Sequence, residues 1–217
     1  MIAVNTPTQY VFFPYHEDSS RYSLIDEDKF KKEFPKTHKY LSDYKQNLLD
    51  RRDSRYTWRE KNLPWYSLHR IGVPENHQKN KIITGSILKD ARFSIDDIGY
   101  LIPHGGIFAI ISEQSLSMLL AYLNSKIVWF FLKSIASPKR GGYISLDVGT
   151  LSQIPVPEFN ADVKMMEIEK LAVDIQIQIS ESEEKIHEYE LQIDKYFYSI
   201  FNFSKEEISY IEKILKF

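Results

Sequence analysis

Apolar and polar residues alternate in short runs over the first 60 residues, which predicts strands and short helices. Residues 9–15, QYVFFPY, are typical of a strand that Pro14 ends, and residues 26–34 of a short polar helix. Residues 35–52 predict a longer helix with Pro35 in its first turn. One face of this helix is expected to carry the apolar side chains Tyr40, Leu41, Tyr44 and Leu48.

The middle of the chain predicts a small sheet. Residues 81–85 indicate a strand, and residues 91–112 indicate a strand, a Gly-Gly turn and a second strand. Residues 143–146, YISL, predict one more strand. The prolines of residues 154–157, IPVP, cannot continue a helix or a central strand, so we expect the chain to leave the domain there.

An apolar helix is expected over residues 113–135, with Ser112 as its N-cap. It is apolar nearly all round, which favours a position between two layers. Its uninterrupted apolar run, residues 127–132, is far shorter than the roughly 20 residues that a membrane span needs. We therefore interpret it as a buried core helix and expect no membrane partner.

The last 60 residues show a heptad pattern with one additional four-residue step. It predicts a single helix over about residues 161–200, roughly 60 Å long. A second, short helix follows, for which Ser204 and Glu207 form a capping box. The heptad seam consists of Ile168, Leu171, Ile175, Ile179, Ser182, Ile186, Tyr189, Ile193, Tyr196 and Ile200.

These elements predict an α+β fold with two parts. Residues 1–157 form a mixed α/β domain, and residues 158–217 form a helical segment for dimerisation or docking, as a hairpin or a coiled coil. The chain has 217 residues and no cysteine, which excludes disulfides and cysteine-based zinc sites and fits a reducing cytoplasm. The first residues lack the basic and apolar regions of a secretory signal, so a cytoplasmic protein is expected.

Charge is distributed unevenly along the chain, although the net charge is only -2. Residues 36–92 hold 13 Lys and Arg against 6 Asp and Glu, whereas residues 158–217 hold 7 against 14. This asymmetry indicates two surfaces that bind different partners. Acidic solvated helices explain the second stretch well, but solubility alone does not explain the first.

The motifs of several enzyme classes are absent. There is no Gly-rich phosphate loop, no Asn-Pro-Pro or Asp-Pro-Pro tetrapeptide of an amino-methyltransferase, and no histidine and carboxylate grouping for a metal. Asp96 and Asp97 lie in a turn-like segment, where surface turn chemistry is favoured over acid–base catalysis. The sequence therefore predicts a binding module without catalytic residues, metal or cofactor of its own.

The basic stretch interleaves cations with aromatic residues, as nucleic-acid readers do, since Lys and Arg neutralise phosphates and Arg can grip guanine. Each cation alone could be a solvated charge. For Trp58, Trp65 and Tyr66, contact with bases or ribose competes with packing in a core, which is favoured for the tryptophans. His104 is either a loop-tip contact or part of a plain turn. The candidate DNA contacts here are Arg51, Arg52, Arg55, Arg59, Arg70, Lys81, Lys89 and Arg92.

The segment SPKRGGY, residues 137–143, adds two cations and two glycines between the apolar helix and the next strand. Gly141 and Gly142 would let backbone N–H groups approach a phosphate, and Lys139 and Arg140 would add charge. A Gly-Gly turn with incidental cations explains the segment equally well.

Several segments occur in an order that resembles a known family. They include VFFPY, FPKTHKYLSDYKQNLLDRR, WYSLHR, KIITGSILKDARFSIDDIGYLIP, the stretch from LLAYLNSKIVWFF to SQIPVP, and IDKYFYSIFNFSKEEISYIE. Over almost the whole chain they resemble the TaqI-like C-terminal specificity domain of adenine-specific DNA methyltransferases and type IIG restriction-modification enzymes.

The resemblance implies a module that recognises double-stranded DNA and is followed by spacing or docking helices. It further implies a methyltransferase domain or subunit as a partner, which would use S-adenosylmethionine, and a parent that could also cleave DNA. A homodimer through the C-terminal helices is a further possibility. The sequence leaves two alternatives open: a coiled-coil assembly protein that binds an acidic protein, and a nuclease with a dispersed active site.

Overall fold

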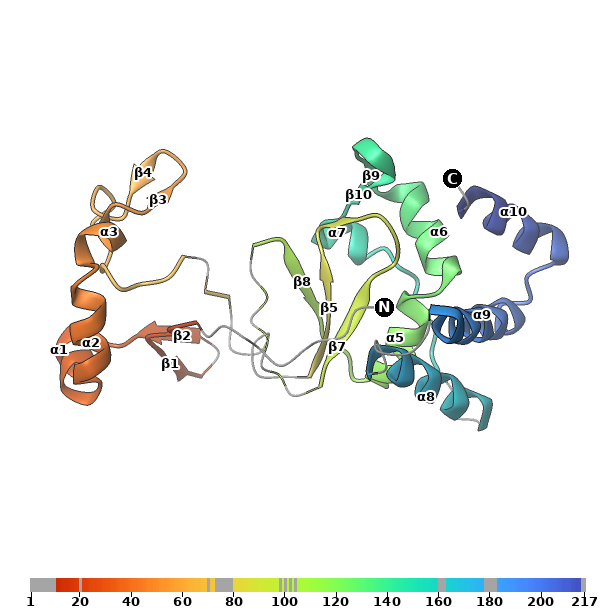
Figure 1. The fold of residues 1–217 in the computed structure, drawn as a ribbon, viewed down its shortest axis with the longest axis horizontal. Helices are drawn as coiled ribbons and strands as arrows, with labels where there is room; N and C mark the ends of the chain where they lie inside the picture. The colour runs from red at the N-terminus through yellow and green to blue at the C-terminus, as the bar shows by residue number, and fades with distance from the viewer. Residues whose placement is uncertain are drawn as a thin grey trace. The chain divides into compact units, whose positions relative to one another are not determined.

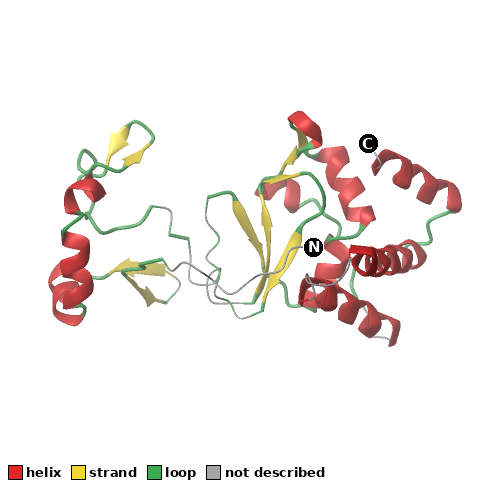
Figure 2. Ribbon diagram, in the orientation of Figure 1, coloured by secondary structure: helices red, strands yellow, loops and turns green. Residues whose placement is uncertain are grey.

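Two separately folded units divide the chain, and the division falls between residues 77 and 78 (Figure 1). The computed structural model describes residues 11–19, 21–69, 71–72, 80–97, 99, 101, 103, 105–159, 163–177 and 183–215. We refer to residues 7–77 as the small unit and to the part from residue 78 onward, with which residues 1–6 are grouped, as the large unit. Figure 2 shows that both units contain helices and strands, as the expected α+β class requires.

The small unit begins with a hairpin and continues with three short helices and a second, very short hairpin. The first hairpin pairs β1 with β2, Tyr15 lying opposite Leu24. The second pairs β3 with β4, Asp53 lying opposite Tyr56. In chain order the elements are β1 (Tyr15–Asp18), β2 (Arg21–Leu24), α1 (Glu27–Glu33), α2 (Pro35–Ser42), α3 (Lys45–Leu49), β3 (Arg52–Asp53) and β4 (Tyr56–Thr57).

The core of the small unit is aromatic. Phe30 from α1 packs with Trp65 and Tyr66 from the segment after β4, and all three are buried. The indole N–H of Trp65 donates to Glu27 Oε1 at 2.8 Å. Trp58 is also buried, and its indole N–H donates to Ser67 Oγ at 3.0 Å. The expectation that the tryptophans pack in a core is confirmed for both.

The large unit contains two antiparallel three-stranded sheets and the longer helices. One sheet has the order β7-β5-β8 and the other β6-β10-β9. The elements are β5 (Lys81–Gly85), β6 (Ile87–Leu88), β7 (Phe93–Asp96), β8 (Ile107–Ile110), α5 (Leu116–Leu123), α6 (Lys126–Ile135), β9 (Ser137–Pro138), the 3-10 turn η1 (Arg140–Gly142), β10 (Ile144–Ser145), α7 (Val148–Leu151), α8 (Val163–Ile177), α9 (Glu183–Ile200) and α10 (Lys205–Leu215).

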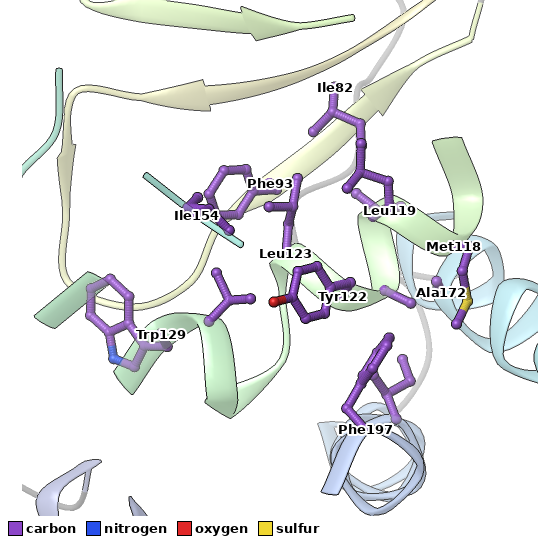
Figure 3. Packing of buried hydrophobic residues seen from close by; sticks show 14 of the residues in the cluster. Ile82, Phe93, Met118, Leu119, Tyr122, Leu123, Trp129, Ile154, Ala172 and Phe197 are labelled. Atoms are coloured by element: carbon purple, nitrogen blue, oxygen red, sulfur yellow. The ribbon is translucent and has the colours of Figure 1, made fainter. Parts of the chain in front are cut away.

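Helix α5 lies at the centre of the large unit. Leu119 and Leu123 face the sheet side chains Ile82 and Phe93, and Tyr122 meets Phe197 of α9 (Figure 3). The hydroxyl of Tyr122 donates to the carbonyl of Pro155 at 2.5 Å. Burial raises the pKa of this phenol to about 12, so it stays a neutral donor.

Two expectations for the small unit are wrong in detail. The first described residues, 11–14, are not in a strand, and β1 begins after Pro14. The expected helix over 35–52 is two helices, because α2 ends at Ser42 and α3 starts at Lys45. Leu41 and Leu48 pack against the core, whereas Tyr40 and Tyr44 are exposed. The short helix over 26–34 is confirmed, with Asp26 as its N-cap.

The expected helix over 113–135 is also broken. Ser115, not Ser112, caps α5, and α6 starts after a bend of 61° at residues 124–125. Asn124 stabilises the break, because its side chain accepts from the N–H of Phe93 and donates to the carbonyl of the same residue, both at 3.0 Å. Within the described residues no single helix is long and apolar enough to cross a membrane. The bent pair of α5 and α6 passes only by length and composition, and both helices bury apolar side chains in the core.

The expected sheet is partly confirmed. Strands form at 81–85, at 93–96 and at 107–110, but the last two do not pair as a hairpin, since each pairs with a different edge of β5. Asp96 is not a surface turn residue. It is buried, and its carboxylate accepts from the ammonium of Lys81 at 2.7 Å and from the N–H of Gly99 and of Leu101.

The expected single helix of 60 Å is wrong, because α8 and α9 are two helices that pack on each other and on α5. The seam residues Ile168, Ile175, Ile193 and Tyr196 are buried in the core of the large unit. The chain divides after residue 77, and the boundary expected at residue 157 stays a prediction. This burial also removes the free apolar seam on which the coiled-coil alternative depended.

Candidate nucleic-acid interface

Cations from two distant segments meet at one end of the β6-β10-β9 sheet. Ile144 of β10 lies opposite both Leu88 of β6 and Pro138 of β9. One residue further along each outer strand, the register places Lys89 and Lys139 on either side of Tyr143. Neither the spacing nor the periodicity of the sequence shows that residues 89 and 139 are neighbours.

The turn after β9 has a defined backbone conformation. The N–H of Lys139 donates to the carbonyl of Tyr143 at 2.7 Å, which closes the turn. Gly141 and Gly142 have φ angles of 76° and 79°, a region that L side chains rarely adopt. All residues from 137 to 143 are exposed, and Tyr143 is 41% exposed. In this turn, two glycines in the left-handed backbone conformation therefore lie next to two exposed cations.

Arg92 lies near this end of the sheet, but it is paired. Its guanidinium donates through Nε and Nη2 to both carboxylate oxygens of Asp90, with the Nη2 contact at 3.0 Å. The hydrogen bond and the charge of Asp90 raise the pKa of Arg92, and the phenol of Tyr143 contributes a weaker electrostatic effect. We define Lys89, Arg92, Lys139, Arg140 and Tyr143 as the sheet-end cluster.

Arg51 of the small unit is a structural residue. Its Nε donates to the carbonyl of Leu48 at 2.8 Å, and its Nη2 donates to the carbonyls of Trp65 and Ser67, both at 3.0 Å. The guanidinium carbon lies 4.8 Å from the ring centre of Trp58. Burial lowers the pKa of Arg51, although an arginine remains charged at neutral pH. These contacts use three of the five N–H donors of the guanidinium, so the side chain is committed to holding the fold of the small unit.

The other cations of the small unit differ in how far they are engaged. Arg59 donates to Asp50 Oδ1 at 3.0 Å and to Gln46 Oε1 at 2.8 Å. Arg52 Nη1 donates to the carbonyl of Arg55 at 3.2 Å. Arg55 is exposed at the tip of the β3–β4 hairpin, where its guanidinium carbon lies 4.9 Å from the ring centre of Tyr56.

Some candidates lie elsewhere. Lys81 is fully buried in its ion pair with Asp96, so it cannot contact DNA in this structure. Arg70 and His104 lie outside the described residues. Tyr143 and Tyr56 are exposed aromatic neighbours of the cations that were not predicted from the sequence. Their exposure could have been expected from the sequence, because Tyr143 directly follows a glycine pair and Tyr56 directly follows a turn.

A second polar cluster joins the helices of the large unit and is structural in character. Asp194 of α9 accepts from the N–H of Lys126 at 2.8 Å, at the first turn of α6. The ammonium of Lys126 donates to Glu212 of α10 at 2.8 Å. Burial raises the pKa of Asp194, against the lowering effect of Lys126. A cavity of about 350 Å³ adjoins the cluster and is lined by side chains that include Leu191, Tyr198, Phe203 and Ile208.

Among the described residues, no group of three or more histidine and acidic side chains is arranged to hold a metal ion. The chemistry that the described surface offers is therefore charge and hydrogen-bond donation from cations, with aromatic rings beside them.

Comparison with known proteins points to one family. The chain is 25% identical over 164 residues to the type II restriction enzyme and methyltransferase RM.Eco57I of Escherichia coli, covering 72% of this chain and 16% of that protein. It is 27% identical over 188 residues to the type II methyltransferase M.MjaIV of Methanocaldococcus jannaschii, covering 83% of this chain and 60% of that protein. The chain thus spans less than two thirds of the length of either relative. Residues 21–156 match the TaqI-like C-terminal specificity domain, and the chain belongs to that family.

Proposed function

We propose that this chain recognises a specific sequence in double-stranded DNA as the specificity module of a restriction-modification system. It would position the DNA for an adenine-specific methyltransferase, and in some parents for an endonuclease, in a domain outside this chain. The family match and the two type II relatives support the class of system. The adenine specificity rests on the sequence resemblance alone.

The sheet-end cluster is the observation that carries the proposal. Lys89, Lys139 and Arg140 are exposed. Strand register places Lys89 and Lys139 at the same end of one sheet, although 50 residues separate them, and Arg140 follows Lys139 in the turn. Cations grouped in this way attract the phosphate backbone, which supplies much of the affinity of DNA-binding proteins. Gly141 and Gly142 carry no side chain that would keep a phosphate away from their backbone N–H groups.

The catalytic step would belong to the partner domain, which would bind S-adenosylmethionine. This module would work in the cytoplasm, on the same DNA as its partner. Contact with that domain, or with a second copy of this chain, is proposed for the outer face of the C-terminal helices. Apolar side chains that are partly exposed on or next to these helices are Ile200, Phe201, Tyr210 and Ile214.

The test compares the DNA binding of two double variants, one that lacks two cations of the turn and one that lacks two cations elsewhere in the chain. Lys139→Ala combined with Arg140→Ala should weaken binding to all duplexes about equally, because phosphate contacts carry no base information. The slope of log K against log salt should fall by about 0.9 for each lost contact. Lys205→Ala combined with Lys213→Ala, two exposed cations of α10, removes the same charge and should leave the slope unchanged.

Affinity can be measured by fluorescence anisotropy with labelled duplexes at several salt concentrations. Equal slopes for both double variants and the wild type would show that the turn does not contact phosphate. If the wild-type chain binds no duplex at low salt, the proposed function itself is wrong.

A further inference from the structure

The β3–β4 hairpin of the small unit has the dimensions of an element that can enter the major groove. It consists of two strands of two residues each, joined by Ser54 and Arg55. Ser54 has a φ of 60°, a positive value such as the first central residue of a tight hairpin turn adopts. Paired strands lie about 4.8 Å apart, and the major groove is about 12 Å wide and admits a two-stranded ribbon.

Both ends of this hairpin are fixed to the core of the small unit. Before β3, Arg51 holds the carbonyls of Leu48, Trp65 and Ser67. After β4, the N–H of Trp58 donates to the carbonyl of Arg51 at 3.0 Å. The tip therefore projects from a rigid base, so a side chain on it has a defined position relative to the unit.

Residues 52–61 hold four Lys and Arg against two Asp and Glu, so the hairpin and its flank carry a net positive charge. The carboxylate of Asp53 is paired with Lys61 at 2.5 Å and lies 3.2 Å from the Nε2 of His69. The N–H and hydroxyl of Thr57 and, more weakly, Arg52 hold the pKa of Glu60 below its ordinary value. Within the described residues no ion pair involves Arg55.

The guanidinium of Arg55 is both exposed and oriented. It lies against Tyr56, a ring that is itself 45% exposed, so the cation–π contact restrains the side chain without covering its donors. A guanidinium presents a planar fork of N–H donors, which matches the O6 and N7 acceptors of guanine in the major groove. An oriented fork loses less conformational freedom when it binds.

We propose that Arg55 reads a guanine base edge in the major groove from the tip of the β3–β4 hairpin. This inference rests on the proposed function, and it assigns base reading to the small unit and phosphate contact to the sheet-end cluster of the large unit. Arg51 is then a positioning residue, and Arg59 is held away from DNA by Asp50 and Gln46.

The experiment compares charge-conserving variants of two arginines. The wild-type chain is used to select duplexes from a random pool, and binding is then measured on the selected site and on single-base changes of it. Arg55→Lys keeps the charge but loses the fork, so discrimination should fall about 5- to 150-fold at one G·C position and stay unchanged elsewhere. Arg59→Lys is the matched control and should keep the full preference.

Each other outcome has a definite meaning. If Arg55→Lys keeps the preference at every position, Arg55 does not read a base. If only Arg55→Ala weakens binding, and it does so equally for all sequences, Arg55 contacts phosphate and the inference is overturned while the proposed function survives. A wild-type chain that binds duplexes without any sequence preference would overturn both. Because Arg55 is exposed, we expect unchanged thermal unfolding for each of its variants.

Discussion

The large and the small unit are stabilised by different kinds of contact. The core of the large unit combines side chains from a sheet, from α5 and α6, and from the C-terminal helices. The main buried cluster of the small unit consists of Phe30, Trp65 and Tyr66, with partly buried residues around them, and Trp58 is buried beside Ser67. A unit of about 70 residues buries a smaller fraction of its surface than a larger one, so apolar packing alone leaves it only marginally stable.

Polar contacts of the small unit compensate for its limited core. Tyr66 donates to the carbonyl of Ile25 at 2.7 Å, and Arg51 ties three carbonyls together. Some basic residues of this unit therefore stabilise the fold, whereas others face solvent. The sequence alone does not distinguish the two kinds. In the large unit, by contrast, Lys89, Lys139 and Arg140 lie exposed beside the sheet end.

We expect the largest effect from Phe197→Ala in α9. This ring is fully buried and lies 5.2 Å from the ring centre of Tyr122. The loss of a buried phenylalanine costs about 3–5 kcal/mol, because it removes apolar contact and leaves a cavity. Urea unfolding followed by hydrogen exchange of the α5 amides would measure the change in the large unit.

Ile200→Ala on the same helix is the control, since Ile200 is 41% exposed and should cost no more than about 1 kcal/mol. Equal, small effects of both variants would mean that α9 is a separable appendage, as expected from the sequence, and that the comparison of the two cores is wrong.

Arg51→Ala should destabilise the small unit by about 1.5–3 kcal/mol. The change removes charged hydrogen bonds and leaves the carbonyls of Leu48, Trp65 and Ser67 without this donor. Arg51→Lys should not restore stability, because one ammonium cannot replace the separate Nε and Nη2 donors with which the planar guanidinium reaches these three carbonyls. The fluorescence of the buried tryptophans reports unfolding, and Arg55→Ala serves as the exposed control. If Arg51→Ala unfolds at the same urea concentration as Arg55→Ala, polar contacts do not hold this unit.

Much of the fold could be predicted where local rules decide the structure. The strand over 81–85, the helix that starts after Asp26, and the Ser204–Glu207 capping box are confirmed because caps and residue alternation act within a few residues. The helix breaks were not predictable in this way. The one at Asn124 depends on a strand 31 residues away, to which its amide binds.

The heptad pattern misled for a related reason. An apolar seam indicates only that a helix is covered, and the covering partner here is α5 of the same unit rather than a second chain. The candidate site shows the same limit. The residue types at 139–142 could be recognised from the sequence. The approach of Lys89 follows from strand register, and the engagement of Arg51 depends on the carbonyls of Trp65 and Ser67, 14 and 16 residues away.

Gly142→Ala should cost about 1–2 kcal/mol in the large unit. At a φ of 79° an L side chain is strained, and an added Cβ would meet no atom within 4 Å, so steric contact does not contribute. Gly85→Ala is the control, since its Cβ would make only ordinary contacts at 3.6 Å and its φ is not positive. Thermal unfolding measures both. An unchanged melting temperature for Gly142→Ala would show that the turn does not hold the left-handed conformation. It would then contradict the idea that this backbone is fixed in a shape that binds phosphate.

We expect the smallest effect from the ionisation of Glu207 at the start of α10, the part of the large unit that buries only Ile211 within its described residues. Its carboxylate accepts from the N–H of Ser204 at 2.7 Å, and this bond holds the pKa of Glu207 below the ordinary value of 4.5. The folded form therefore releases its proton more readily than the unfolded form. The contribution to stability is present above pH 4.5 and is lost as the pH falls through the folded-state pKa. Glu207→Gln keeps an oxygen acceptor but does not titrate, so the difference in α10 helicity between wild type and variant should vanish in acid. Helicity can be followed by NMR chemical shifts of the α10 amides between pH 2 and 7. A difference that stays constant over this range would mean that packing against α6, and not the cap, sets the stability of this helix.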